Sequence, residues 1–278
     1  MGGMALLRQL YHDADWYSKG NITTTDRTIE AFNANANRPQ IIAAGSRANA
    51  LRADKVGDQF NVQYTILGGG DEYERIQDVK NTNATFIIPI NFPKPYDVDN
   101  SYLASRLELE SMREWNQRPA NPKILAEHGV QFALTLHDLK SPKAFKTNLL
   151  SAVNYGLNKT TALEALTTIP ALVLNNSKIG NLNSGSYANF MISSGDFFDS
   201  KSTVVEHWIR GSRHVFEDIT RQDIRGQYNF DLEGITYTLD VAGSKAKPTA
   251  SLKSDQTQYS SSLSYENDWV HLLFTGQD

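Results

Sequence analysis

The spacing of hydrophobic residues differs between two parts of the chain. Up to about residue 178, short apolar runs alternate with stretches in which apolar residues recur every three or four positions. The apolar runs lie at 40–44, 63–67, 85–90 and 130–134. The helical stretches lie at 4–17, 26–36, 47–58, 71–81, 101–115, 120–128, 142–156 and 160–174. Near-continuous apolar strands between helices predict an α/β fold with a parallel sheet, because such strands are buried on both faces.

From about residue 179 the helical period gives way to alternation of polar and apolar residues. The alternating segments are 203–209, 226–232, 235–242, 247–253, 259–264 and 268–274, divided by Gly, Asp or Ser turns. This pattern predicts antiparallel β-structure, as a sheet or a sandwich. We therefore expect three parts, 1–178, 179–223 and 224–278.

Four parallel strands are half of an eight-stranded β/α barrel. An open half-barrel leaves one wall of its core exposed, and large apolar patches are rarely left bare. We therefore expect the remainder of a longer chain, or a homo-oligomer, to complete the barrel.

Composition narrows the classes of function. The 278 residues carry a formal charge of −4 and no cysteine. A nucleic-acid partner is not expected without a basic excess, and disulfides, thiolate nucleophiles and cysteine-bound zinc are excluded. The N-terminus does not resemble a signal peptide, and no run approaches about 20 apolar residues. We expect a soluble protein without a membrane partner, and leave open whether it is cytoplasmic or periplasmic.

Two strand ends carry candidate chemistry. Gly68-Gly69-Gly70 joins a strand to a helix, so its amides are candidates for holding an anion, with a tight turn as the simpler alternative. The tripeptide lacks the spacing of the known phosphate loops, and Asp71 and Glu72 already stand at the positive end of the predicted helix.

His137 and Asp138 follow the fourth strand. In a functional interpretation they are catalytic, with Asp138 as a base or ligand. In the structural alternative Asp138 caps the following turn. On the N-terminal helix, His12 and Asp15 share a face, which indicates a solvated surface more than a metal site, because two ligands do not make a site.

The stretch 145–213 carries a family resemblance. Its segments are FKTNLLSAVNYGL at 145–157, ALEALTTIPA at 162–171 and IGNLNSGSYANF at 179–190, followed by Gly211. The spaced Thr167, Pro170 and Ala171 and the later glycines resemble the C-terminal part of the amidohydrolase superfamily, in particular its imidazolonepropionase-like branch. The runs FALT at 132–135 and NFP at 91–93 fit the same branch.

The resemblance implies a partial (β/α)8 TIM barrel, about strands five to eight, followed by antiparallel β-sandwich segments. It also implies hydrolysis of a non-peptide carbon–nitrogen bond of a small-molecule substrate, with a divalent metal such as zinc that activates water. In the family, histidines stand at the ends of strands five and six and an Asp at the end of strand eight.

This chain departs from the family at each of these positions. Gly45-Ser46 and Gly68-Gly69-Gly70 stand where imidazoles are expected, Asp138 falls one position late, and the sequence contains no His-x-His. We therefore predict no metal ligand in this segment. The candidate catalytic residues are Asp138 and His137, and the candidate binding residues are Ser46, Gly69, Asp71 and Asn91.

The alternative to a hydrolase is a non-catalytic binding or structural module, because a fold does not guarantee its chemistry. The aromatic residues of the tail 224–278 are compatible with binding of a polymer or glycan, although aromatic residues are also common in the cores of β-sheets. The tyrosine and tryptophan residues of the tail, together with Trp208 from the preceding segment, are Trp208, Tyr228, Tyr237, Tyr259, Tyr265 and Trp269.

Overall fold

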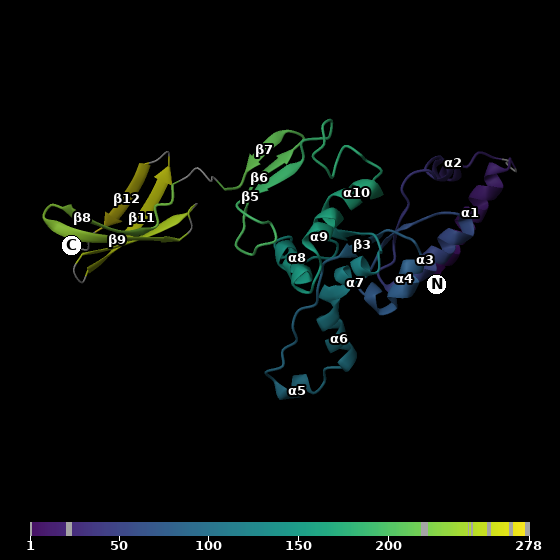
Figure 1. Ribbon diagram of the computed structural model, residues 1–278, viewed down its shortest axis with the longest axis horizontal. Coiled ribbons are helices and arrows are strands. Elements are labelled where there is room, and N and C mark those ends of the chain that lie inside the picture. Colours follow the sequence, from purple (N-terminus) through teal and green to yellow (C-terminus); the bar gives the residue numbers. More distant parts are fainter. Residues whose placement is uncertain are drawn as a thin grey trace. The chain divides into compact units, whose positions relative to one another are not determined.

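The computed structural model describes residues 2–20, 24–217, 222–243, 245, 247–254, 257–266 and 269–275. Contacts group the chain into two compact units, 1–189 with 198–200 and 190–197 with 201–278, drawn in Figure 1. The division at 178 and 223 stays a prediction. Residues 218–221 of the predicted second part, and residue 268 of the last predicted strand, lie outside the described residues.

The first unit contains a four-stranded parallel sheet. Its strands are β1 (Ile41–Ala43), β2 (Thr65–Leu67), β3 (Phe86–Pro89) and β4 (Phe132–Thr135), in the order β1-β2-β3-β4. Each of the four predicted apolar runs overlaps one of these strands, and β4 extends one residue past its run, to Thr135. The α/β prediction with a parallel sheet is therefore confirmed.

The helices of this unit follow the predicted stretches, with some of them broken. They are α1 (Gly2–Ser18), α2 (Arg27–Ala34), α3 (Arg47–Phe60), α4 (Ile76–Asn81), α5 (Ser101–Ala104), α6 (Leu109–Gln117), α7 (Asn121–Glu127), α8 (Ala144–Asn154), α9 (Lys159–Leu166) and α10 (Thr168–Val173), with the 3-10 helices η1 (Glu72–Arg75) and η2 (Arg118–Ala120). The predicted helix 160–174 breaks at Thr167, whose backbone leaves the helical region (φ −129°, ψ −76°). Its hydroxyl donates to the Leu163 carbonyl at 2.7 Å and so helps end the last turn of α9. The predicted helix 101–115 is likewise divided into two helices, α5 and α6. No helix among the described residues is long and apolar enough to cross a membrane.

The two faces of the parallel sheet differ in burial. On one face Ile66, Phe86 and Ile88 are fully buried. On the other face Ala43, Leu67, Ile87 and Ala133 lie side by side in the strand register, and burial rises from exposed at Ala43 to buried at Ala133. Parallel sheets are normally covered on both faces. This second face is apolar yet incompletely covered by the described residues.

The second unit is antiparallel, as predicted. One sheet has the order β5-β6-β7, with β5 (Phe190–Ser193), β6 (Val204–Ile209) and β7 (Ser212–Val215). The tail forms a five-stranded sheet in the order β12-β11-β10-β9-β8, with β8 (Gly226–Leu232), β9 (Ile235–Gly243), β10 (Pro248–Ser254), β11 (Thr257–Glu266) and β12 (Trp269–Thr275).

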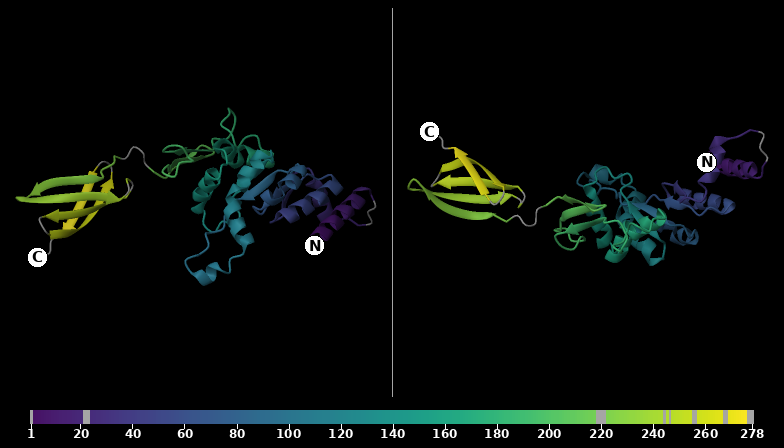
Figure 2. Two further views of the ribbon diagram at one scale, coloured as in Figure 1. Left: turned by 60° about the horizontal axis from the view of Figure 1, so that its bottom comes forward. Right: turned by 90° about the horizontal axis from the view of Figure 1, so that it is seen from above.

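The tail sheet curls around an aromatic core. The rings of Tyr237 on β9 and Phe274 on β12 are 5.6 Å apart although two strands lie between them in the sheet, and Figure 2 shows the yellow strands crossing the green ones. Tyr259 packs against both rings. Tyr237 forms the buried core with Leu239, Val241 and Leu252, and Tyr259 and Phe274 pack against it partly buried, whereas Trp269 is 72% exposed.

Candidate functional site

A cavity of about 270 Å³ lies at the carboxyl ends of the parallel strands. It is lined by Ala43, Gly45, Leu67, Gly68, Gly69, Pro89, Asn91, Arg118, His137 and Asp138. Four of the six residues singled out from the sequence therefore line one cavity, namely Gly69, Asn91, His137 and Asp138. The strand ends bring them together because all four strands run in the same direction.

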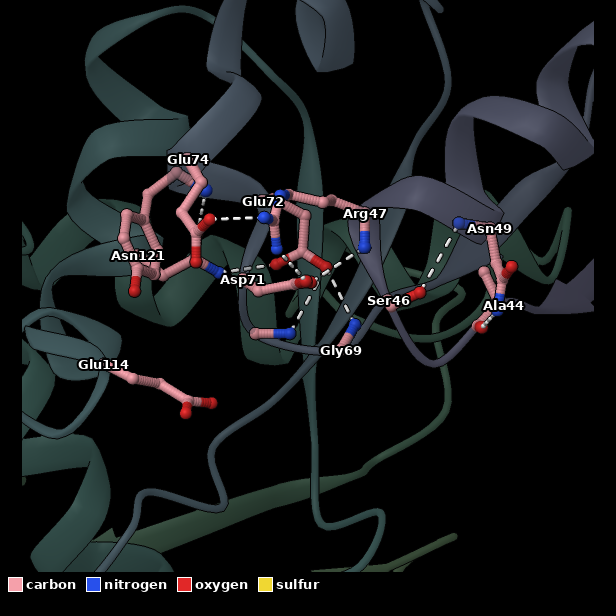
Figure 3. A network of polar contacts seen from close by, with 12 residues as sticks. Ala44, Ser46, Arg47, Asn49, Gly69, Asp71, Glu72, Glu74, Glu114 and Asn121 are labelled. Atoms are coloured by element: carbon pink, nitrogen blue, oxygen red, sulfur yellow. Dashed lines mark hydrogen bonds and ion pairs between the residues drawn. The ribbon is translucent and has the colours of Figure 1, made fainter. Parts of the chain in front are cut away.

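The glycine turn after β2 holds the buried side-chain carboxyl group of Glu72. The Glu72 Oε1 atom accepts hydrogen bonds from the Gly69 amide at 2.8 Å and the Gly70 amide at 3.2 Å (Figure 3). Its Oε2 atom accepts from Asn121 Nδ2 at 2.7 Å, and Asn121 Oδ1 accepts from the Tyr73 amide at 2.9 Å. The amides of the turn do bind an acceptor group, but that group is the side-chain carboxyl of this chain's own Glu72.

Glu72 is fully buried. This burial shifts the pKa of its carboxyl group and leaves no space for side chains at the neighbouring glycines. Burial raises the pKa of the Glu72 carboxyl above its usual 4.5, while the hydrogen bonds from Gly69 and Asn121 act in the opposite direction. A Cβ atom at Gly68 would lie 2.1 Å from Glu72 Oε1, and one at Gly69 would lie 2.4 Å from the Gly45 carbonyl oxygen. The glycines are therefore required by close packing of the turn.

Asp71 and Ser46 serve the start of α3 and are absent from the cavity lining. Asp71 accepts from the Arg47 amide through Oδ1 and from Arg47 Nη1 through Oδ2, both at 2.8 Å (Figure 3). Ser46 is the N-cap of α3, and its hydroxyl accepts from the Asn49 amide at 3.4 Å. Asp71 instead lines a neighbouring groove together with α6.

The turn after β4 is open by comparison. His137 Nε2 lies 3.3 Å from Asp138 Oδ2, and these side chains are 51% and 75% exposed. Asn91 Nδ2 donates to the Asp138 carbonyl at 2.9 Å, which joins the ends of β3 and β4. Asp138 has a left-handed backbone (φ 59°) and, among the described residues, its side chain caps no helix. Its carboxylate therefore faces solvent and the cavity.

Arg118 is the site residue that sequence analysis missed. It begins η2 and lines both the cavity and the groove beside α6. Its Nη2 atom pairs with Glu114 Oε1 at 2.6 Å, and its Nη1 atom lies 4.0 Å from where a Cβ atom of Gly70 would be. Its Nε atom is buried without a hydrogen-bond partner in the described part of the chain. An arginine next to Pro119 at a helix start gives no local signal that it reaches the strand ends.

The cavity residues do not fit a divalent metal. Tetrahedral or octahedral sites need three or more His, Asp, Glu or Cys ligands, and the described residues contain no such cluster. Within the cavity only His137 and Asp138 are of these types, and glycines line the ends of β1 and β2.

The remaining candidates from the sequence, His12, Asp15 and Trp208, make contacts with other side chains of the protein. Asp15 pairs with Lys19 at 2.6 Å, while His12 packs edge-on against Phe60. Trp208 stacks on Phe190 and donates from Nε1 to Glu206 at 2.9 Å.

Solved structures share this fold. An amidohydrolase from Thermotoga maritima matches with a TM-score of 0.62 and 22% identity, covering 78% of this chain and 56% of its own. Another amidohydrolase matches with a TM-score of 0.50 and 18% identity, covering 69% and 48%. A Xaa-Pro dipeptidase with bound methionine reaches a TM-score of 0.48 at 16% identity, covering 63% and 44%. No family model and no curated protein matches the chain.

These likenesses concern the fold. The chain shares its fold with these solved amidohydrolases, which supports the resemblance of residues 145–213 at the level of the fold. It spans about half the length of the solved structures that it matches.

Proposed function

We propose that this chain is part of an amidohydrolase-type hydrolase, that β1–β4 serve as strands five to eight of a β/α barrel, and that the strand-end cavity binds a small polar molecule without holding a divalent metal through its own side chains. The observation that carries this proposal is the lining of the cavity. It joins residues from all four strand ends around about 270 Å³ but contains just two residues of metal-ligand type, His137 and Asp138.

The uneven sheet supports the barrel part of the proposal. The apolar face formed by Ala43, Leu67, Ile87 and Ala133 is the interior wall in a closed barrel, where the other strands cover it. In the described sheet β1 and β4 are the outer strands, and each would pair with a further strand. That cover comes from the remainder of a longer chain or from a second copy, and β5–β7 would belong to the companion sandwich.

The test of the metal-free site is direct. The 278-residue chain is purified with zinc, manganese or cobalt added, and the bound metal is measured together with turnover of cyclic amides and Xaa-Pro dipeptides. We expect less than ~0.1 equivalent of bound metal and no turnover, because the cavity offers too few ligands for a divalent metal. The threshold is low because a catalytic site holds its metal tightly. One equivalent of metal and turnover, both lost in Asp138→Asn, would refute the proposal.

The second candidate is a non-catalytic module in which the barrel serves binding or packing alone. The glycines that follow β2 favour it, since Gly68 and Gly69 are held by packing and leave no space for a ligating side chain. The reading frame on the N-terminal side of Met1 discriminates the two. A His-x-His and a fourth-strand Lys or Glu there favour the hydrolase, and their absence favours the module.

A further inference from the structure

We propose that the strand-end cavity recognises a small carboxylate, and that the guanidinium of Arg118 is the group that binds it. This inference rests on the proposed binding role of the cavity and adds the chemical class of the ligand. It concerns a residue that sequence analysis did not single out.

The first step is the hydrogen-bonding capacity of the cavity wall. The amides of Gly69 and Gly70 are occupied by Glu72, and the Gly68 amide donates to the Ile87 carbonyl at 3.0 Å. The glycine turn therefore has no amide left for a ligand. Of the side-chain donors that remain on the described wall, His137 offers a ring nitrogen and Asn91 Nδ2 keeps one N–H beyond its bond to the Asp138 carbonyl, whereas Arg118 alone carries a permanent positive charge.

The second step is the state of the Arg118 side chain. Glu114 engages Nη2 alone, and Nη1 lies toward Gly70 at the cavity. The side chain is 27% exposed, so ordering it against a ligand needs little further loss of conformational freedom. A guanidinium group binds a planar carboxylate through charge-assisted hydrogen bonds, which are stronger than neutral ones.

The third step is what surrounds that charge. Ala43, Leu67 and Pro89 give the cavity an apolar floor, while Asn91 Oδ1 and the Asp138 carboxylate supply acceptors. Asp138 disfavours a second negative charge on the ligand. The fitting molecule is a small monocarboxylate that also carries a hydroxyl or another donor group. L-lactate is a suitable probe, and L-lactamide is its neutral counterpart of the same shape.

The experiment measures binding of both probes to the full 278-residue chain by NMR titration in the presence of EDTA. We expect saturable 1:1 binding of lactate, with lactamide at least tenfold weaker. Arg118→Gln should weaken lactate at least tenfold without changing lactamide, and Arg118→Lys should fall between the two. The control is Arg113→Gln, which removes the same charge from α6 at a residue that lines the groove but not the cavity; it should stay within twofold.

A second variant tests the same claim without removing the arginine. Glu114→Gln removes the negative charge that competes for the guanidinium while keeping the size of the side chain, so lactate binding should tighten at least threefold. Equal effects of Arg118→Gln and Arg113→Gln, lactamide binding as strong as lactate, inorganic phosphate displacing lactate with higher affinity, or no saturable binding would each overturn the inference. Because EDTA is present, a metal found in the earlier test refutes the proposed metal-free site independently of this result.

Discussion

The turns after β2 and β4 contribute to the same cavity but use their polar groups in opposite ways. After β2, the Gly69 and Gly70 amides are satisfied by a fully buried Glu72. After β4, His137 and Asp138 contact each other and are at least half exposed. A buried polar group needs an internal partner, whereas an exposed one has water or a ligand. The difference in burial supports a structural role for the first turn and is consistent with the binding role that we propose for the second.

Substitution of the closest-packed glycine should have the largest effect. Gly69→Ala places a Cβ atom 2.4 Å from the Gly45 carbonyl oxygen, so the strand ends must move apart. We expect the free energy of unfolding to fall by about 3 kcal/mol, measured by urea titration. Gly195→Ala is the control, since its nearest neighbour is Ser202 Oγ at 4.0 Å, and it should change stability by less than about 0.5 kcal/mol. Equal stability of the two variants would show that the β2 turn is not rigid.

Substitutions of the buried Glu72 should have the next largest effect on stability, and two variants separate the contribution of its size from that of its charge. Glu72→Ala removes the partner of Gly69, Gly70 and Asn121, and should lower the free energy of unfolding by about 2.5 kcal/mol. Glu72→Gln keeps the size and an acceptor oxygen and should cost about 1 kcal/mol near neutral pH.

The same pair of proteins carries a pH signature. Because burial raises the pKa of Glu72 in the folded state, the folded protein holds this proton more tightly than the unfolded chain does. The contribution of Glu72 to stability is then complete below pH 4.5 and is lost as the pH rises through the folded pKa. Urea unfolding at successive pH values should show this loss in the wild type and not in Glu72→Gln. Parallel pH profiles would mean that Glu72 titrates normally.

How much the sequence predicts differs between the same two turns. The strands β2 and β4 were predicted because buried parallel strands are continuous apolar runs, and the tight glycine turn and the position of His137 followed from the strand ends. The burial of Glu72 was not predicted, since a glutamate at a helix start is usually solvated. Arg118 was missed because it reaches the strand ends only through the tertiary placement of η2, which brings together segments that are distant in sequence.

Backbone strain at the open turn gives a smaller effect. Asp138 has φ 59°, which glycine adopts freely and alanine does not. Asp138→Ala should therefore lower the free energy of unfolding by about 1 kcal/mol, while Asp138→Gly should leave it within about 0.5 kcal/mol of the wild type. Thermal and urea unfolding of both variants provide the measurement. If Asp138→Gly loses as much as Asp138→Ala, the carboxylate itself stabilises the fold, and the assignment of this turn to binding fails.

The smallest change in stability is expected at His137. Its side chain is half exposed, and its contact with the Asp138 carboxylate is at the surface, where polar contacts of this kind contribute little. His137→Ala should therefore change the free energy of unfolding by less than about 0.5 kcal/mol. The same variant removes a donor from the cavity wall, so binding of a small polar ligand should weaken while stability does not. A loss of stability as large as that of Glu72→Ala would place His137 in the structural class and remove the difference between the two turns.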